Sequence, residues 1–284
     1  MINFRKIGIA VTMVLGVWGM TGVTAAHAAQ DIATPATLVQ KGVLTVCSDL
    51  SNPPAEGVAD DGKTPKGAAL DIVYAVAKKL RLKPEIDNYQ FSGIFAALDT
   101  GKCDLIMASL GKTPERAQRY ALVDYWSVAS GLLVRQGNPY HMTHFEDLSG
   151  HRVSALLGSR NAKVVKQISD QLVSEGRAPI DIVLMNSYVA AFQELMLGRV
   201  DALVADTVVI NYFNQQGHGR LEVGGVPVPP KTWSMAIMKN NVELKNAVAA
   251  AIDQLNADGT MQAISKKWGL ETGVALCSSS HPCE

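Results

Sequence analysis

The sequence contains few charged residues of either sign. Only 18% of its 284 residues are Asp, Glu, Lys or Arg, and the 26 basic and 26 acidic side chains cancel to a formal net charge of zero. A balanced chain creates no field that would attract nucleic acid or an anionic membrane surface, so we expect neither as a partner. Hydrophobic residues make up 48% of the chain, enough for a sizeable core.

Cysteine is scarce as well, and none of the four residues forms a CxxC pair. Cys277 and Cys283 lie in a short tail and could close a small ring, whereas Cys47 and Cys103 lie in or beside strand-like apolar runs, where a free cysteine acts as a small hydrophobe. His281 neighbours only the tail cysteines, a spacing that disfavours zinc. We expect no metal, no cofactor and no catalytic residues, because the six histidines suggest no catalytic or metal constellation.

Long hydrophobic runs are missing beyond the first residues. Arg5 and Lys6 precede an uncharged, mostly apolar run over 7–23, and an A-x-A cleavage pattern ends at Ala28. This arrangement predicts a signal peptide over residues 1–28, cleavage near Ala28 and a periplasmic location. The alternative is an uncleaved membrane anchor, which the short, glycine-containing span disfavours.

Two stretches about a hundred residues apart share one pattern. Residues 101–109 read GKCDLIMAS and residues 198–206 read GRVDALVAD. The offset of 97 residues carries Ser109 onto Asp206, and a unit used twice indicates two similar lobes. Ligands of open α/β sheets bind beyond the carboxyl ends of the strands, so we expect Ser109 and Asp206 on opposite sides of one cleft.

Strand and helix patterns alternate along the chain, which predicts mostly parallel sheets flanked by helices. The expected strands are 43–47, 85–89, 104–108, 130–134, 152–156, 180–184, 201–205 and 234–238. The expected helices are 68–82, 91–98, one from 113, 159–173, 187–197, 207–214, 242–255 and 261–268.

This order predicts an α/β protein of two lobes joined by two crossings, near 129–136 and 222–232, which would serve as a hinge. The expected parts after the signal peptide are the N-terminal part of lobe 1 over 29–130, lobe 2 over 131–228, a return segment completing lobe 1 over 229–270, and a tail over 271–284.

A helix start at 113–116 contains one residue that does not fit. Thr113 is a good N-cap and Pro114 suits the first position, but a cation at Arg116 opposes the helix dipole by roughly 0.3–1 kcal/mol. Helix-start amides with a guanidinium would make a strong carboxylate site. The alternative is that Arg116 pairs with Glu115 or points to water, and local chemistry leaves both interpretations open.

Small polar residues precede a helix in each unit. Ser109 and Gly111 offer a hydroxyl and close backbone approach, although such residues more often form a plain strand-end turn. Gly158, Ser159 and Arg160 take the matching place in the second unit, where Ser159 is also a predicted N-cap.

Acidic residues follow two of the expected strands. Asp206 either caps the next helix or faces the cleft as a partner for an ammonium, and Asp49 could act in the same way. Phe91 is an aromatic wall or a core residue. Arg116 and Asp206 together would hold the carboxylate and the ammonium of an α-amino acid, charges that need paired partners when buried.

The chain resembles the family 3 solute-binding proteins of bacterial polar amino-acid ABC transporters over roughly residues 41–270. The segments that carry the resemblance are GVLTVCSD, KGAALDIVYAVAKKL, FSGIFAALDTGKCDLIMASLGKTPERA, DLSGHRVSALLGS, LGRVDALVADTVV and DGTMQAISKKWG. It implies a type II periplasmic-binding-protein fold, each lobe a mostly parallel sheet flanked by helices, with two crossing hinge strands.

The resemblance also implies roles. It assigns Arg116, with Ser109 and Gly111 nearby, to the ligand carboxylate, Asp206 to the ligand ammonium and Ser159 to a second carboxylate contact.

It assigns Asp49 and Phe91 to the ligand side chain. The sequence departs from the family at Asn52 and Ala55, where aromatics are usual, and at Arg160, where a small hydroxyl residue is common. The side-chain pocket is therefore expected to differ, with Arg160 facing an acidic ligand group or pointing outward.

The implied function is a periplasmic receptor that closes over an amino acid or similar small zwitterion and delivers it to an ABC permease. We expect a monomer with a small-molecule ligand and no enzymatic activity. One alternative is an enzyme on the same scaffold, similar to prephenate or cyclohexadienyl dehydratases, which needs a general acid such as Asp49 or Asp206. Another is a ligand-sensing module whose signalling part lies on a different protein.

Overall fold

A computed structural model describes residues 31–225, 228–279 and 281–283 of the chain. The predicted signal peptide, residues 1–28, lies outside the described residues. In the described part, no helix is long and apolar enough to cross a membrane.

The strands follow the expected alternation. They are β1 (Val43–Ser48), β2 (Gly57–Val58), β3 (Pro65–Lys66), β4 (Lys83–Asn88), β5 (Leu105–Gly111), β6 (Tyr120–Arg135), β7 (Arg152–Leu156), β8 (Asp181–Met185), β9 (Ala202–Asp206), β10 (Leu221–Val223), β11 (Val228–Met238) and β12 (Val274–Leu276). Hydrogen bonds join most of them in the order β4-β1-β5-β11-β6-β9-β7-β8, while β10 and β12 also pair with β6.

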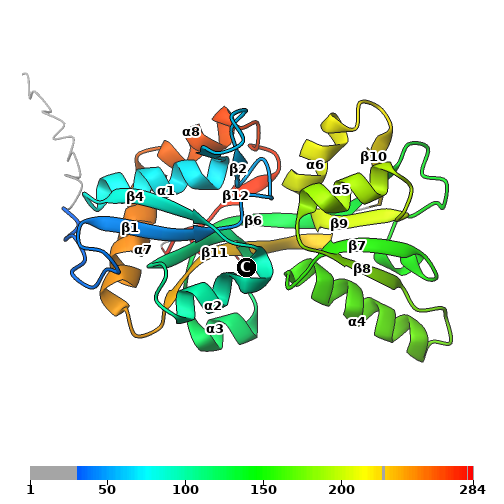
Figure 1. The fold of residues 1–284 in the computed structure, drawn as a ribbon, viewed down its shortest axis with the longest axis horizontal. Coiled ribbons are helices and arrows are strands. Elements are labelled where there is room, and N and C mark those ends of the chain that lie inside the picture. The colour runs from blue at the N-terminus through cyan, green and yellow to red at the C-terminus, as the bar shows by residue number, and fades with distance from the viewer. Residues whose placement is uncertain (1–30, 226–227, 280, 284) are drawn as a thin grey trace, which may run out of the picture. The chain divides into compact units, whose positions relative to one another are not determined.

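Pairing is parallel within each lobe and antiparallel where the lobes meet. We call β4, β1 and β5 with their helices lobe 1, and β9, β7 and β8 with their helices lobe 2. β1 runs parallel to β4 and β5, and β7 runs parallel to β8 and β9. β6 and β11 are antiparallel to their neighbours and run between the lobes (Figure 1).

Helices cover both faces of the sheet. They are α1 (Ala68–Lys79), α2 (Ile94–Asp99), α3 (Pro114–Arg119), α4 (Arg160–Ser174), α5 (Tyr188–Met196), α6 (Thr207–Gln216), α7 (Val242–Ala257) and α8 (Thr260–Lys267), with 3₁₀ turns at Phe91–Gly93 and Phe145–Leu148. Figure 1 shows α1 and α8 on one side of the lobe 1 strands and α2 and α3 on the other, and in lobe 2 α5 and α6 opposite α4.

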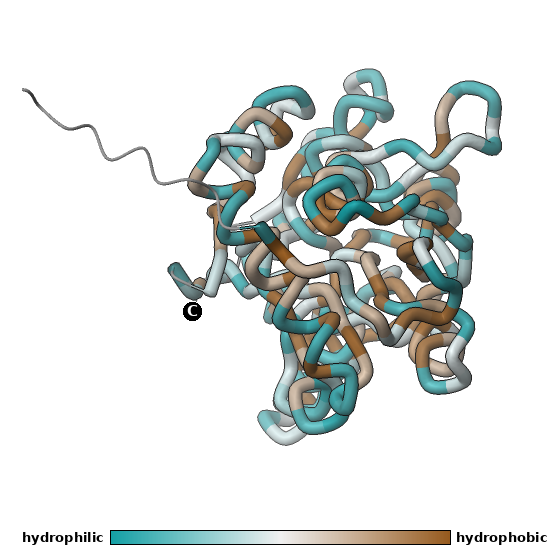
Figure 2. The backbone as a smooth tube through the Cα atoms, turned by 90° about the vertical axis from the view of Figure 1, so that its left-hand side faces the viewer, coloured by the Kyte–Doolittle hydropathy of each residue, from teal (hydrophilic) through white to brown (hydrophobic). Residues whose placement is uncertain are grey.

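The core forms where apolar helix faces meet the strands. Leu70, Ile72 and Val76 of α1 are fully buried, as the helical spacing predicts. A smaller apolar cluster in lobe 2 includes Val165 of α4 and Val153 of β7. Figure 2 shows apolar backbone segments gathered inside and polar segments in the outer loops.

The crossing strand β6 is longer than the sequence pattern predicts. The expected strand over 130–134 is only the end of a 16-residue strand that begins at Tyr120. Its first part pairs with β11 and its last part with β9, so Ser130 pairs with both Val228 and Asp206. The sequence pattern predicted only five of these residues as a strand. The short helix α3 ends immediately before Tyr120, so the hydrophobic pattern changes from helical to strand spacing with no loop residues to mark the boundary.

β11 also begins earlier than the expected strand over 234–238, and it includes Pro229 and Pro230. Proline cannot donate a hydrogen bond to a sheet and is found at edges or bulges. The register of β11 against β6 shifts between Val228 and Lys231, which accommodates the two prolines.

The repeated sequence pattern corresponds to a repeated structural device. Gly101 and Gly198 follow α2 and α5 with φ of 69° and 68°, a left-handed conformation that glycine adopts without strain and that ends helices. Asp104 accepts a hydrogen bond from Thr45 N of β1, and Asp201 accepts one from Arg152 N of β7. Each aspartate thus fixes the neighbouring strand, and the strand after it leads to Ser109 or Asp206.

All four cysteines form disulfides. The expectation that Cys47 and Cys103 are free is wrong: they are bonded, with Cα atoms 5.7 Å apart. Val46 and Cys47 of β1 pair with Leu105 and Ile106 of β5, which brings Cys103, just before β5, within the usual disulfide distance. Tertiary pairing of strands 56 residues apart creates this contact, and no local pattern reports it.

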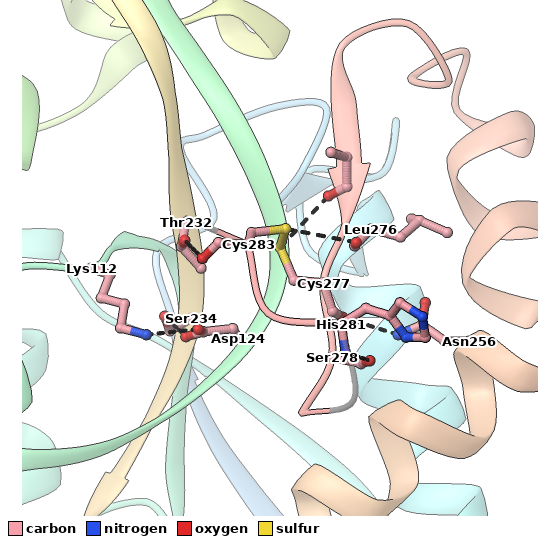
Figure 3. The surroundings of a disulfide bond; sticks show 11 residues. Lys112, Asp124, Thr232, Ser234, Asn256, Leu276, Cys277, Ser278, His281 and Cys283 are labelled. Carbon is pink, nitrogen blue, oxygen red and sulfur yellow. Dashed lines mark hydrogen bonds and ion pairs between the residues drawn. A yellow bond between two sulfur atoms is a disulfide. The ribbon is translucent and has the colours of Figure 1, made fainter.

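The second disulfide, Cys277–Cys283, closes the tail ring that the sequence allows. The tail binds both crossing strands. β12 pairs with β6 between Val274–Leu276 and Trp126–Val128, and Thr232 of β11 donates a hydrogen bond to the carbonyl oxygen of Cys283 (Figure 3). The ring therefore lies against the segment through which the lobes are joined.

Candidate functional site

A pocket lies where the strand ends of the two lobes face each other. Its lining residues are Asn52, Phe91, Ala108, Ser109, Gly111, Leu156, Ser159, Arg160, Asn161, Tyr188 and Asp206. Seven of the nine predicted site residues are in this set, and Ser109 and Asp206, which the repeat relates, share it. The space left is about 20 Å³, room for about one water molecule.

Arg116 lies beside this pocket, although it is not among the lining residues. Its Nη1 donates to Gly111 O at 2.6 Å and its Nη2 to Gly158 O at 3.1 Å, so the side chain connects lobe 1 with lobe 2. The guanidinium lies 5.6 Å from the ring centre of Phe91 and 5.2 Å from that of Phe95. These two carbonyls, rather than Glu115 or bulk water, are its hydrogen-bond partners.

Burial lowers the pKa of this guanidinium but leaves it charged. Arg116 is 8% exposed, and desolvation, followed by the nearby positive charge of Arg160, lowers its pKa to about 10. It is therefore charged at neutral pH. With two N–H groups held by carbonyls, its remaining donors can serve a ligand carboxylate, the anion that a guanidinium binds most strongly through paired hydrogen bonds.

Asp206 ends β9 and stands at the N-cap position of α6, but its side chain makes no capping hydrogen bond. Its Oδ1 lies within hydrogen-bond distance of Ser130 Oγ (2.7 Å), Asn161 Nδ2 (3.2 Å) and Arg160 Nη2 (3.4 Å), and its Oδ2 accepts from Trp233 Nε1 at 3.1 Å. The carboxylate is 8% exposed, so these donors compensate a buried negative charge.

Sequence reasoning missed the partners of Asp206. Ser130 and Trp233 belong to the crossing strands β6 and β11, and Asn161 follows Arg160 in α4. The aspartate is thus fixed by the hinge as well as by lobe 2. No local signal marks Ser130 or Trp233, because their role depends on strand pairing at a distance.

Ser159 and Arg160 open α4. Ser159 accepts a hydrogen bond from Ala162 N, the N-cap that the sequence predicts, and it also lines the pocket. Arg160 turns inward rather than outward: its Nη2 donates to Ser130 Oγ at 2.6 Å and forms an ion pair with Asp206.

Asp49 and Asn52 lie in lobe 1 on the other side of the pocket. Asp49 is buried outside the lining and accepts hydrogen bonds from the backbone N–H groups of Ser51 and Phe91. It therefore fixes the start of the turn that carries Phe91. Burial raises the pKa of Asp49, and these hydrogen bonds oppose the rise. Asn52 lines the pocket and donates to Glu56 Oε2 at 2.7 Å.

Glu56 is a buried titratable residue that the sequence interpretation missed. It is 0% exposed, and Ser109 Oγ lies 2.9 and 2.8 Å from its two carboxyl oxygens. These contacts hold Ser109 in a left-handed backbone conformation with φ of 47°, which is costly for a residue with a side chain. Glu56 stands in a Pro/Gly/Asp loop, where nothing in the sequence indicates burial.

Burial raises the pKa of Glu56 to about 8, with hydrogen bonds from Ser109 and Asn52 opposing the rise. In the folded protein this carboxyl keeps its proton to higher pH than in the unfolded chain, whose value is 4.5. The free energy of unfolding therefore falls as pH rises from about 4.5 to about 8, by at most about 1.4 kcal/mol per pH unit.

We expect Glu56→Gln to flatten this dependence, because the amide has no proton to lose. Urea unfolding between about pH 5 and pH 8 measures the pH dependence of the free energy of unfolding. The variant should gain stability relative to the wild type as pH rises. Glu271→Gln, at an exposed position, is the control and should leave the slope unchanged. An identical slope in wild type and Glu56→Gln would contradict the assignment of a protonated carboxyl.

No group of three or more His, Cys, Asp or Glu side chains that could hold a metal ion occurs within residues 31–225, 228–279 and 281–283. The pocket instead combines carboxylate, amide, hydroxyl and guanidinium groups. Such a set can bind a small charged solute through hydrogen bonds and ion pairs.

The sequence model of the family "Bacterial extracellular solute-binding proteins, family 3" matches residues 44–271. Among curated proteins, the L-cystine-binding protein TcyJ of Escherichia coli (strain K12) is 26% identical over 231 residues, covering 81% of this chain and 83% of that protein. The arginine-binding protein ArgT of Corynebacterium glutamicum is 28% identical over 242 residues, covering 84% and 78%.

Solved structures share the two-lobed fold. An ancestral arginine-binding protein bound to arginine is 31% identical with a TM-score of 0.74, covering 80% of this chain and 98% of that chain. The ancestral amino acid-binding protein AncCDT-1, a precursor of cyclohexadienyl dehydratase, is 28% identical with a TM-score of 0.71, covering 80% and 95%.

Proposed function

Because the chain belongs to the bacterial extracellular solute-binding proteins, family 3, we propose that it captures an amino acid or a similar small zwitterion between its lobes and delivers it to the permease of an ABC transporter. The observation that carries the proposal is the pocket between the lobes with a buried guanidinium at one side and a buried carboxylate at the other. Arg116 binds the α-carboxylate, and Asp206 binds the α-ammonium.

The contacts of these two residues support the assignment. Gly111 both lines the pocket and accepts a hydrogen bond from Arg116, so the guanidinium adjoins the space that Asp206 also faces. Ser109, Gly111 and Ser159 add a hydroxyl, an open backbone position and a helix start near the carboxylate end. Phe91 forms an aromatic wall, and Asp49 acts by fixing that wall.

Ligand capture is coupled to closure of the lobes. The lobes are joined through β6 and β11, and Arg116 already reaches across to Gly158. A ligand that bonds to both lobes favours the closed state through its differential affinity. A micromolar dissociation constant corresponds to about −8 kcal/mol, within reach of two charge-assisted ends and one side chain.

Curated relatives bind amino acids and the family is extracellular, so the chain is proposed to work in the periplasm as a monomer, with permease subunits as its partners. An enzyme on this scaffold needs a proton donor in the cleft. Asp206 already accepts hydrogen bonds from Asn161 and Trp233, which supports binding rather than catalysis. Turnover of prephenate would favour the enzyme instead.

A thermal-shift screen of the protein lacking residues 1–28 against amino acids, amines and small carboxylic acids tests the proposal. A ligand present at a hundred times its dissociation constant stabilises the native state by about 2.7 kcal/mol, or about 5–10 °C in Tm. The methyl ester and the N-acetyl derivative of the same amino acid are matched controls, because each lacks one charged end, and neither should shift Tm. A folded protein that no amino acid stabilises would contradict the proposal.

A further inference from the structure

Arg160 occupies the part of the pocket where a ligand ammonium would meet Asp206. Its guanidinium lies 2.6 Å from Ser130 Oγ and 3.4 Å from Asp206 Oδ1, and its side chain is 13% exposed. A methyl group added at Gly111 would come within 2.9 Å of Arg160 Nε, so the side chain lies directly against lobe 1. With Arg160 in this position, about 20 Å³ of the pocket remains open.

Arg160 competes with a ligand ammonium for Asp206. A carboxylate offers about four lone-pair sites, and four groups already lie within hydrogen-bond distance of it: Ser130, Asn161, Arg160 and Trp233. The Arg160 contact is the longest of the four. An ammonium that binds at Oδ1, which Ser130, Asn161 and Arg160 already share, therefore displaces the guanidinium of Arg160.

A displaced Arg160 needs a new anionic partner. A guanidinium left unpaired in a closed, desolvated cleft is strongly unfavourable. Asp49 is held by two backbone amides, and Glu56, with a pKa of about 8, is mostly protonated at neutral pH. An amino acid with a neutral side chain uses its carboxylate at Arg116 and brings nothing for Arg160, while a basic side chain adds a second unpaired cation.

We propose that this pocket selects an acidic amino acid, whose second carboxylate replaces Asp206 as the partner of Arg160. The ligand then carries three charged ends, and each meets one opposite charge: Arg116, Asp206 and Arg160. Arg160 is the specificity-determining residue. The inference rests on the proposed function, because it assumes that an amino acid is bound through Arg116 and Asp206.

Calorimetric titration with matched acid and amide pairs tests the inference: L-glutamate against L-glutamine and L-aspartate against L-asparagine. The wild type should bind an acid about a hundredfold or more tightly than its amide, because only the acid pairs with Arg160. Arg160→Met keeps an unbranched stem without the charge, and it should remove this preference. Arg177→Met, at an exposed position just beyond the C-terminal end of α4, should retain it.

The outcomes separate the two proposals. Equal affinity of the wild type for an acid and its amide, or an unchanged preference in a folded Arg160→Met protein, overturns the role of Arg160 but leaves amino-acid capture standing. Failure of the folded wild type to bind any amino acid overturns the proposed function and, with it, the inference. The comparison within the wild type stays decisive even if Arg160→Met does not fold.

Discussion

Arg116→Ala should abolish ligand binding while the protein still folds. The guanidinium is the buried cation beside the pocket, and without it the ligand carboxylate is desolvated with no partner. Removing one member of a buried ion pair costs about 3–5 kcal/mol, which is more than about a hundredfold in the dissociation constant. Calorimetric titration with the ligand found by the thermal-shift screen measures the loss.

Arg119→Ala is the matched control because it lies in the same short helix. Arg119 is exposed and pairs with Asp99 at 2.9 Å, a surface contact worth about 0–1 kcal/mol. Its removal should leave the ligand affinity unchanged. Equal affinity in wild type and Arg116→Ala would show that the carboxylate binds elsewhere.

Asp206→Asn should have an effect of similar size on binding and should also reduce stability. The amide keeps the size of the side chain but loses the charge that holds the ammonium. One of its two polar ends is now an NH₂ group. It faces either Trp233 Nε1 or the N–H donors of Asn161 and Arg160 at the position of Oδ1. An unsatisfied buried donor costs about 1–3 kcal/mol, so Tm should fall together with affinity.

Asp201→Asn separates these two effects. Asp201 accepts a hydrogen bond from Arg152 N at the start of β7 and is not among the residues lining the pocket. Its substitution should lower stability without changing ligand affinity. Affinity retained in Asp206→Asn would contradict the assignment of the ammonium site.

The family and the two-lobed α/β fold were predicted from the sequence and are confirmed. Periodic patterns report helices and buried strands because each buries one face locally. The internal repeat predicted that Ser109 and Asp206 line one pocket, because they occupy equivalent positions near the ends of equivalent strands. Arg116 stood out because a cation in the first helical turn opposes the dipole.

Features that depend on contacts between distant segments were not predicted. The Cys47–Cys103 disulfide and the burial of Glu56 arise from strand pairing and loop packing across more than fifty residues. Trp233 reaches Asp206 because β11 returns between the lobes. The inward turn of Arg160 depends on Ser130, which β6 carries to the junction of the lobes, so the sequence left its direction open.

The ligand-binding roles of the nine predicted residues remain predictions. A crystal structure of the protein with its bound ligand tests their central claim most directly. We predict one small solute between the lobes, with its α-carboxylate about 2.7–2.9 Å from a guanidinium nitrogen of Arg116 and its ammonium at a similar distance from Asp206. A ligand that contacts only one of these residues, or that lies outside the pocket, would contradict the account.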